Sequence, residues 1–275
     1  MVQAKSSKAS AARIQGILAD VSSKGRGLRP AMVIHGAEKV GKTSFAAMAK
    51  NPVFLMSHGE IGLETLIAHG QLGDVPHLPE VKTWPRLLES LEALRDEDHD
   101  YDTVVIDTAN GMEDLLYDFV CETEYGGDRG PRGFLSYMQG YQTATPHWQG
   151  MLRILDELRE KRNITVILLC HTQIKSFKNP AGQDYDRYQP QMHARQWGAT
   201  HKWADIIMFM DTVTVIDEDG NRPKAKGGTQ RIARCERSAA WDAGNRYGLK
   251  EFSLGNSAEE GWKNFMGAMK KARKE

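Results

Sequence analysis

Gly36-Ala37-Glu38-Lys39-Val40-Gly41-Lys42-Thr43 fits the sequence pattern G-x-x-x-x-G-K-[ST]. The preceding residues 31–34 are a short apolar run of the kind found in buried strands. Residues 42–50 are rich in helix-forming residues, and the pair Asn51-Pro52 follows them and ends the helical pattern. The predicted order of strand, glycine-bearing loop and helix is the context that this pattern requires.

A loop of this kind is built to hold a polyphosphate. Gly36 and Gly41 have no Cβ, so the backbone can turn tightly and aim its N–H groups inward, next to the positive end of the following helix. Lys42 is expected to reach the β- and γ-phosphates, and Thr43 to contact Mg²⁺. A chance match in an ordinary loop is the alternative, and the flanking elements argue against it. We therefore predict that ATP and Mg²⁺ are bound by Gly36, Ala37, Glu38, Lys39, Val40, Gly41, Lys42, Thr43 and Ser44.

The composition is that of a globular chain without a strong charge bias. The 275 residues include 36 basic and 36 acidic side chains, so charge alone does not suit the chain to coat duplex DNA, although a local basic groove is possible. The three cysteines are widely spaced, no apolar run approaches the ~20 residues of a membrane span, and residues 1–10 lack the apolar core of a secretory signal. We expect a cytoplasmic protein with three parts: a basic arm or helix (1–28), an ATPase core (29–255), and a C-terminal helix with a basic tail (256–275).

Polar residues follow three further apolar runs, where predicted parallel strands end. Such strand ends lie at the edge of an α/β sheet where ligands bind. Glu60 is a candidate to polarise the water that attacks the γ-phosphate, and Asp107 matches the second signature of phosphate-loop NTPases, an aspartate that holds Mg²⁺ opposite Thr43. His171 and Gln173 are candidates to sense the γ-phosphate, with a purely structural role as the alternative for each. The three apolar runs are residues 53–56, 103–106 and 165–170.

Residues 174–203 interleave basic and aromatic side chains, a composition that suits single-stranded nucleic acid because bases stack and phosphates pair. A plain surface loop is the alternative. A fifth strand at 204–210 and an antiparallel hairpin over 212–236 are predicted to follow. The candidate DNA-binding residues in the basic segment are Lys175, Lys178, Arg187 and Arg195.

Taken in order, these features resemble the RecA-like ATPases. The resemblance is closest to short phage-encoded RecA-like proteins that anneal or pair single-stranded DNA, among the phage nucleotide-binding AAA-type ATPases. It covers roughly residues 30–250 and implies an α/β fold: a RecA-like P-loop core with a mainly parallel twisted sheet flanked by helices and a C-terminal antiparallel β-hairpin. The matching stretches are 36–44, 59–63, 101–108, 167–171 and 244–249.

The resemblance also implies roles for individual residues. Glu60 would be the catalytic base, His171 or Gln173 the sensor that links nucleotide to DNA, and Arg246 a cation that reaches the γ-phosphate of a neighbouring subunit in a ring or filament. Relatives usually carry a second basic residue two positions before that arginine, where this chain has Gly244.

The resemblance implies a phage protein that acts in the cytoplasm of a bacterial host. It would be a DNA-stimulated ATPase that binds single-stranded DNA and promotes annealing or recombination. A single-strand-binding or replication protein is a further expected partner. A nucleotide-gated loader or packaging factor, or a P-loop kinase that phosphorylates a small acceptor, are the alternative functions.

Overall fold

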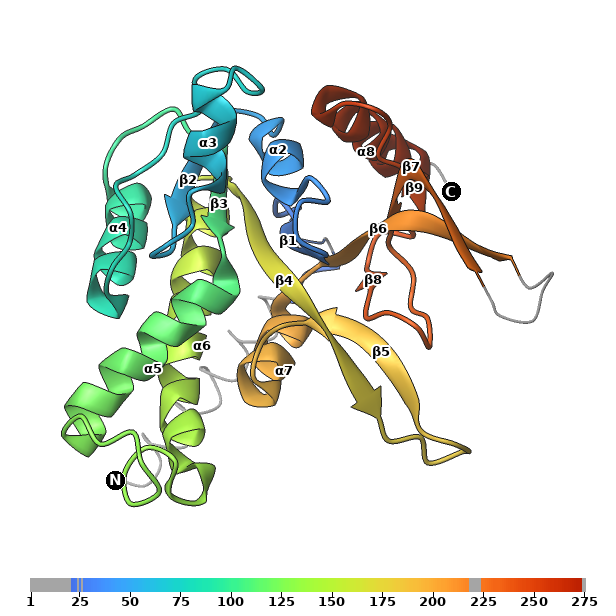
Figure 1. Cartoon of the computed structure of the whole chain (residues 1–275). Helices are drawn as coiled ribbons and strands as arrows, with labels where there is room; N and C mark the ends of the chain where they lie inside the picture. The colour runs from blue at the N-terminus through green and yellow to red at the C-terminus, as the bar shows by residue number, and fades with distance from the viewer. Residues whose placement is uncertain (1–20, 24, 26, 218–223, 274–275) are drawn as a thin grey trace, which may run out of the picture.

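A nine-stranded, mainly parallel sheet forms the centre of the described part of the chain, with helices on both faces (Figure 1). The computed structural model describes residues 21–23, 25, 27–217 and 224–273. The sheet order is β2-β3-β4-β1-β6-β7-β9, with β5 paired to β4 and β8 to β6. The strands are β1 (Ala31–Gly36), β2 (Pro52–Met56), β3 (Thr103–Asp107), β4 (Thr165–Phe177), β5 (Tyr185–Pro190), β6 (Ile206–Asp217), β7 (Lys224–Arg234), β8 (Gly244–Asn245) and β9 (Phe252–Ser253).

The parallel strands read as apolar runs because both of their faces are buried. One face packs against α4, α5, α6 and α7, and the other packs against α2, α3 and α8. Alternation along each strand divides the side chains between the two cores; Val33 and Ile34 of β1, for example, belong to different ones. The helices are α2 (Lys42–Ala47), α3 (Gly62–Ala68), α4 (Trp84–Asp96), α5 (Ala109–Tyr125), α6 (Gln139–Lys161), α7 (Ala194–Trp203) and α8 (Ala258–Ala272), with a 3-10 turn η1 (Ser136–Met138) before α6.

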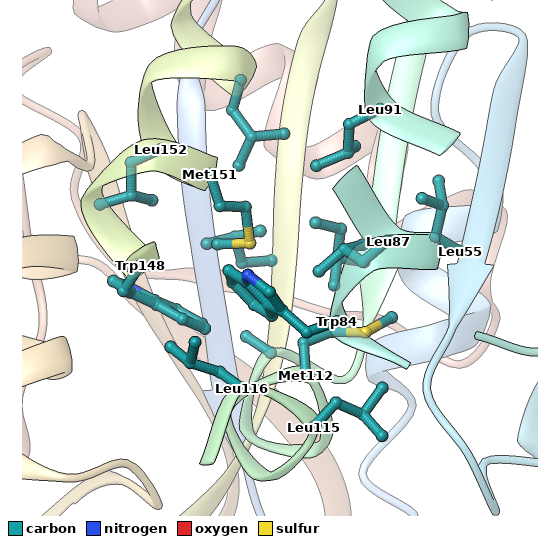
Figure 2. Packing of buried hydrophobic residues seen from close by; sticks show 14 of the residues in the cluster. Leu55, Trp84, Leu87, Leu91, Met112, Leu115, Leu116, Trp148, Met151 and Leu152 are labelled. Atoms are coloured by element: carbon teal, nitrogen blue, oxygen red, sulfur yellow. The ribbon is translucent and has the colours of Figure 1, made fainter. Parts of the chain in front are cut away.

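The larger core is centred on two tryptophans. Trp84 begins α4 and Trp148 lies on α6, and their rings stack with centroids 6.0 Å apart (Figure 2). Met112, Leu115 and Leu116 of α5 pack beside them, so three helices meet over one face of the sheet. This packing fixes α5, the helix that begins just after Asp107.

The predicted fold class is confirmed, but two strands run further than expected. β4 continues past Cys170 to Phe177 and pairs antiparallel with β5, and β6 continues to Asp217 and pairs antiparallel with β7. Part of the expected polar segment 174–203 is therefore a second hairpin followed by α7. In Figure 1 both hairpins project beyond the core sheet.

Residues 1–20 of the predicted N-terminal arm lie outside the described residues. The expected C-terminal helix is present as α8, and Trp262, Phe265 and Met269 pack toward the core that also holds α2. Within the described ranges, no helix has both the length and the apolar character needed to cross a bilayer.

Candidate nucleotide site and nucleic-acid interface

The ends of three neighbouring parallel strands bring the predicted catalytic residues to one edge of the sheet. Strand register places Gly36 of β1 beside His171 of β4, and Asp107 of β3 beside Leu169. The turn after β2 reaches the same edge, because a Cβ added to Gly62 would lie 4.0 Å from Thr43 Oγ1. Residues that are separated by up to 135 positions therefore share one site.

The phosphate loop has the backbone that its glycines predict. Gly41 has φ of 104°, which a side chain would strain, and a Cβ on Gly36 would come within 2.4 Å of the Met210 carbonyl oxygen. The Lys42 ammonium is buried and donates to the carbonyl oxygens of Gly36 and Ala37, both at 2.9 Å. Burial lowers the pKa of Lys42. These neutral acceptors hold the ammonium at the loop, where a phosphate can replace them.

Thr43 and Asp107 form the predicted metal-binding pair. The Thr43 hydroxyl donates to Asp107 Oδ2 at 2.8 Å, and the carboxylate is 4% exposed. Burial raises the pKa of Asp107 to about 6, and the hydrogen bond from Thr43 opposes this shift. A buried carboxylate with a hydroxyl partner fits Mg²⁺, which takes oxygen ligands and is usually bound by few protein groups together with substrate phosphates.

Glu60 and His171 contact each other at the mouth of this site. Glu60 Oε1 lies 3.1 Å from His171 Nε2, and this hydrogen bond is the main cause of a lowered pKa for Glu60. The Nδ1 atom of His171 is buried, and none of the described residues forms a hydrogen bond with it. Gln173 is not brought to Glu60, because its amide donates to the Pro190 carbonyl of β5 at 3.1 Å. Of the two predicted sensors, His171 is therefore the one that touches the predicted base.

Two polar residues of α5 that the sequence analysis did not single out connect this site to the β5–α7 corner. The Asn110 side chain accepts a hydrogen bond from the His171 backbone N–H at 3.1 Å. One turn later, both Glu113 carboxylate oxygens accept from the His193 backbone N–H, at 3.0 and 3.2 Å. Tyr117 donates to Glu113 at 2.7 Å, and burial raises the pKa of Glu113 to about 7. The only sign of Asn110 and Glu113 in the sequence is their i,i+3 spacing, which is too common in helices to identify a functional pair.

Three of the four predicted DNA-binding side chains are exposed, and the fourth is not. Lys175 and Lys178 lie on or next to the β4–β5 hairpin, and Arg195 lies in the first turn of α7. Arg187 is 8% exposed and forms an ion pair with Asp242 at 2.7 Å, so it cannot also contact a nucleic acid. The prediction for Arg187 is wrong: its positive charge is neutralised inside the protein, where it holds the hairpin against the segment before β8.

Arg246 lies at the opposite edge of the sheet from the phosphate loop of its own chain. Its guanidinium pairs with Asp205 at 2.7 Å and donates to the Lys202 carbonyl at 2.6 Å. Asp205 directly precedes β6, whose first residue pairs with Met32 near the start of β1. From Met32 to Gly36 the strand rises about 13 Å, at about 3.3 Å per residue. Arg246 therefore does not serve the phosphate loop of its own chain.

A cavity of about 700 Å³ lies at this same opposite edge, between α8 and the starts of the core strands. Its lining includes Met32, Tyr247, Trp262 and Met266. None of the predicted nucleotide-site residues lines it, so it is separate from the phosphate loop.

Comparison with known protein families identifies the family of this chain. A family model described as an AAA domain matches residues 29–247. This chain belongs to the AAA domain family. Together, the family and the phosphate loop at the end of β1 make this AAA protein a P-loop nucleotide-binding protein. Among solved structures, the crystal structure of the RadB recombinase is similar at 13% identity and a TM-score of 0.44, over 85% of this chain and 91% of that chain. No curated protein sequence matches the AAA protein significantly.

Proposed function

We propose that this AAA protein hydrolyses ATP with Mg²⁺, binds single-stranded DNA, and promotes strand annealing or recombination as an oligomer. One observation carries the proposal: a single strand, β4, joins the two sites. His171 on this strand contacts Glu60 at the nucleotide site, and Lys175, four residues later, is exposed on the projecting hairpin. A strand is stiff, so a displacement at one position is passed to the other.

The residues at the phosphate edge supply the parts needed for phosphoryl transfer to water. Lys42 would bind the β- and γ-phosphates, and Thr43 and Asp107 would hold Mg²⁺, which neutralises phosphate charge. Glu60 would orient and deprotonate the attacking water, and its hydrogen bond to His171 fixes the carboxylate in place. Loss of the γ-phosphate would change what Glu60 and His171 contact, and this change is the proposed signal to β4.

The β4–β5 hairpin offers both components of single-strand binding. Lys175, Lys178 and Arg195 supply exposed cations for phosphates, although Lys178 is paired with Asp184 and would exchange that partner for DNA. On the hairpin, Ile174 pairs with Tyr188, and these side chains are 62% and 41% exposed. An exposed tyrosine ring gives a base a stacking surface, and such stacking is worth about 1–3 kcal/mol per base.

The position of Arg246 favours activation between subunits. Because this arginine lies at the opposite edge from its own phosphate loop, a head-to-tail assembly would bring it to the loop of the next copy. We propose this arrangement as a ring or filament, in a phage protein acting in the bacterial cytoplasm, with a single-strand-binding or replication protein as a further partner.

ATP hydrolysis measured against protein concentration, with and without single-stranded DNA, tests the proposal. The expected result is a turnover per subunit that rises with concentration and rises again with DNA. Tight ATP binding without turnover would instead favour a nucleotide-gated loader. Transfer of phosphate to an added small acceptor would favour a kinase. A turnover that is independent of both concentration and DNA would overturn the proposal.

A further inference from the structure

The guanidinium of Arg231 lies against the phosphate loop of its own chain. Arg231 is on β7, and its Nη1 donates to the Val40 carbonyl oxygen at 3.3 Å while Nη2 donates to the Gly255 carbonyl oxygen at 3.3 Å. A Cβ added to Gly41 would lie only 2.6 Å from Nη1. The guanidinium is therefore packed on the residue that directly precedes Lys42.

We propose that Arg231 is a positioning residue for the nucleotide, which orients the Val40–Gly41 peptide and couples the β6–β7 hairpin to nucleotide affinity. This inference rests on nucleotide binding at the phosphate loop and is independent of the proposed DNA-binding surface.

The geometry of a planar peptide explains how Arg231 acts without touching phosphate. The peptide between Val40 and Gly41 is trans, so its carbonyl and its N–H point in opposite directions. Because Arg231 holds the Val40 oxygen, the Gly41 N–H is directed away from the guanidinium. Gly41, at φ of 104°, has more backbone freedom than any other residue type would have there, so an external contact is needed to fix this donor.

The charge environment of Arg231 differs from that of its neighbour on the same strand. Arg234 pairs with Asp211 and with Glu251. Among the residues that the structure describes, Arg231 is paired with no carboxylate, and its two acceptors are neutral carbonyls. Its charge is therefore not cancelled locally, and it adds positive potential to a loop that receives a polyanion.

The contacts of Arg231 also join three parts of the fold. Its strand pairs with β6, where Thr212 lies opposite Arg231, and Gly255 belongs to the turn before α8. A displacement of the β6–β7 hairpin would therefore move the guanidinium relative to Val40. The reverse also follows, because a nucleotide that orders the loop favours the hairpin position in which this contact is made.

Binding of a fluorescent ATP analogue to the full chain tests the assignment, with Arg231→Met and Arg231→Lys as the variants. Arg231→Met is expected to raise the Kd about tenfold, within the usual range of coupling between two sites. Arg231→Lys keeps one donor and should recover part of the loss. Arg237→Met removes an exposed arginine beyond the end of β7 and is the matched control, expected to stay within twofold of wild type.

Hydrogen exchange tests whether Arg231 positions the phosphate loop for the nucleotide or only stabilises the fold. In the wild-type chain, the ATP analogue is expected to slow exchange at the β7 amides of residues 228–234, and Arg231→Met should lose this protection even at saturating analogue. A Kd for Arg231→Met within twofold of wild type, equal losses in the Met and Lys variants, or unchanged protection would each overturn the proposal. If the wild-type chain failed to bind the analogue, the nucleotide site itself would be overturned.

Discussion

Replacing Glu113 with glutamine is expected to stabilise the protein at alkaline pH and to leave its stability unchanged at acid pH. The Glu113 carboxyl is 4% exposed and is bonded to the Tyr117 hydroxyl and the His193 N–H. No cation is bonded to it in the described structure, and the nearby Asp114 charge disfavours its ionisation further. Ionised Glu113 is therefore a buried charge that only neutral donors stabilise.

The magnitude follows from the pKa. Burial raises the pKa of Glu113 from 4.5 to about 7, so between these values the folded state holds a proton that the unfolded state has lost. The stabilising contribution is complete below pH 4.5 and is lost as the pH rises through 7. At about 1.4 kcal/mol per pKa unit the loss is about 3 kcal/mol, or on the order of 5–10 °C in Tm.

Thermal unfolding at pH 5 and at pH 8.5 measures this effect as the difference in Tm between Glu113→Gln and wild type. The difference should be near zero at pH 5, where both side chains are neutral, and positive at pH 8.5. Glu124→Gln on the same helix, where the side chain is exposed, is the control and should show no difference at either pH. An equal difference for Glu113→Gln at both pH values would refute the reasoning.

Four further variants test the proposed nucleotide and DNA sites. Lys42→Ala should abolish ATP binding or turnover, because the phosphates lose their cation; unchanged hydrolysis would exclude the site. Glu60→Gln should leave ATP bound but slow single-turnover hydrolysis about 10²-fold, and a normal rate would place the base elsewhere. Arg246→Ala should reduce turnover only at concentrations where the protein assembles; an equal loss in dilute protein would remove the role between subunits. Neutralising Lys175 and Lys178 together should lower the slope of log K against log salt for single-stranded DNA by about 1.4, and an unchanged slope would move the DNA path.

The nucleotide edge was predictable because its determinants are local. Glu60, Asp107 and His171 each follow an apolar run, and parallel strands bring their ends to one edge whatever the intervening sequence is. The phosphate loop was predictable for the same reason: its glycines, Lys42 and Thr43 are contiguous, and its strand and helix flank it directly.

The projecting hairpins were only partly predictable, because their polar residues become strand only where a second strand pairs with them. The strand is predicted to end around residues 171–173 and a polar segment to follow from 174, yet residues 171–177 extend the strand because β5 pairs with them. β6 was divided in two for a similar reason, since its first half is buried in the core and its continuation pairs only with β7. Where a strand leaves the core and continues as a two-stranded ribbon, its side chains change from apolar to largely polar. In the sequence, this change looks the same as the end of the strand.

Arg187 shows why a charged residue in a basic segment does not indicate a ligand by itself. Its partner, Asp242, lies 55 positions further along the chain, and nothing in the composition of residues 174–203 points to it. The same carboxylate also accepts from the indole N–H of Trp197 on α7 at 3.0 Å. A buried ion pair with this additional donor fixes the middle of β5 against the segment before β8, while Lys175 and Lys178 stay exposed.

A different element, α5, holds both the start of the β4–β5 hairpin and the candidate nucleotide site. α5 begins two residues after Asp107, and within one turn its side chains accept hydrogen bonds from the backbone of His171 on β4 and of His193 before α7. Both bonds are made by one helix, α5, which begins just after β3 and its Asp107. A change at Asp107 cannot shift α5 without moving both attachment points, whereas β4 alone would move only the first. Asn110→Ala should therefore weaken the link at His171 and leave the His193 contact intact, so any coupling between ATP and the hairpin that survives in this variant would be carried by Glu113 or along β4 itself.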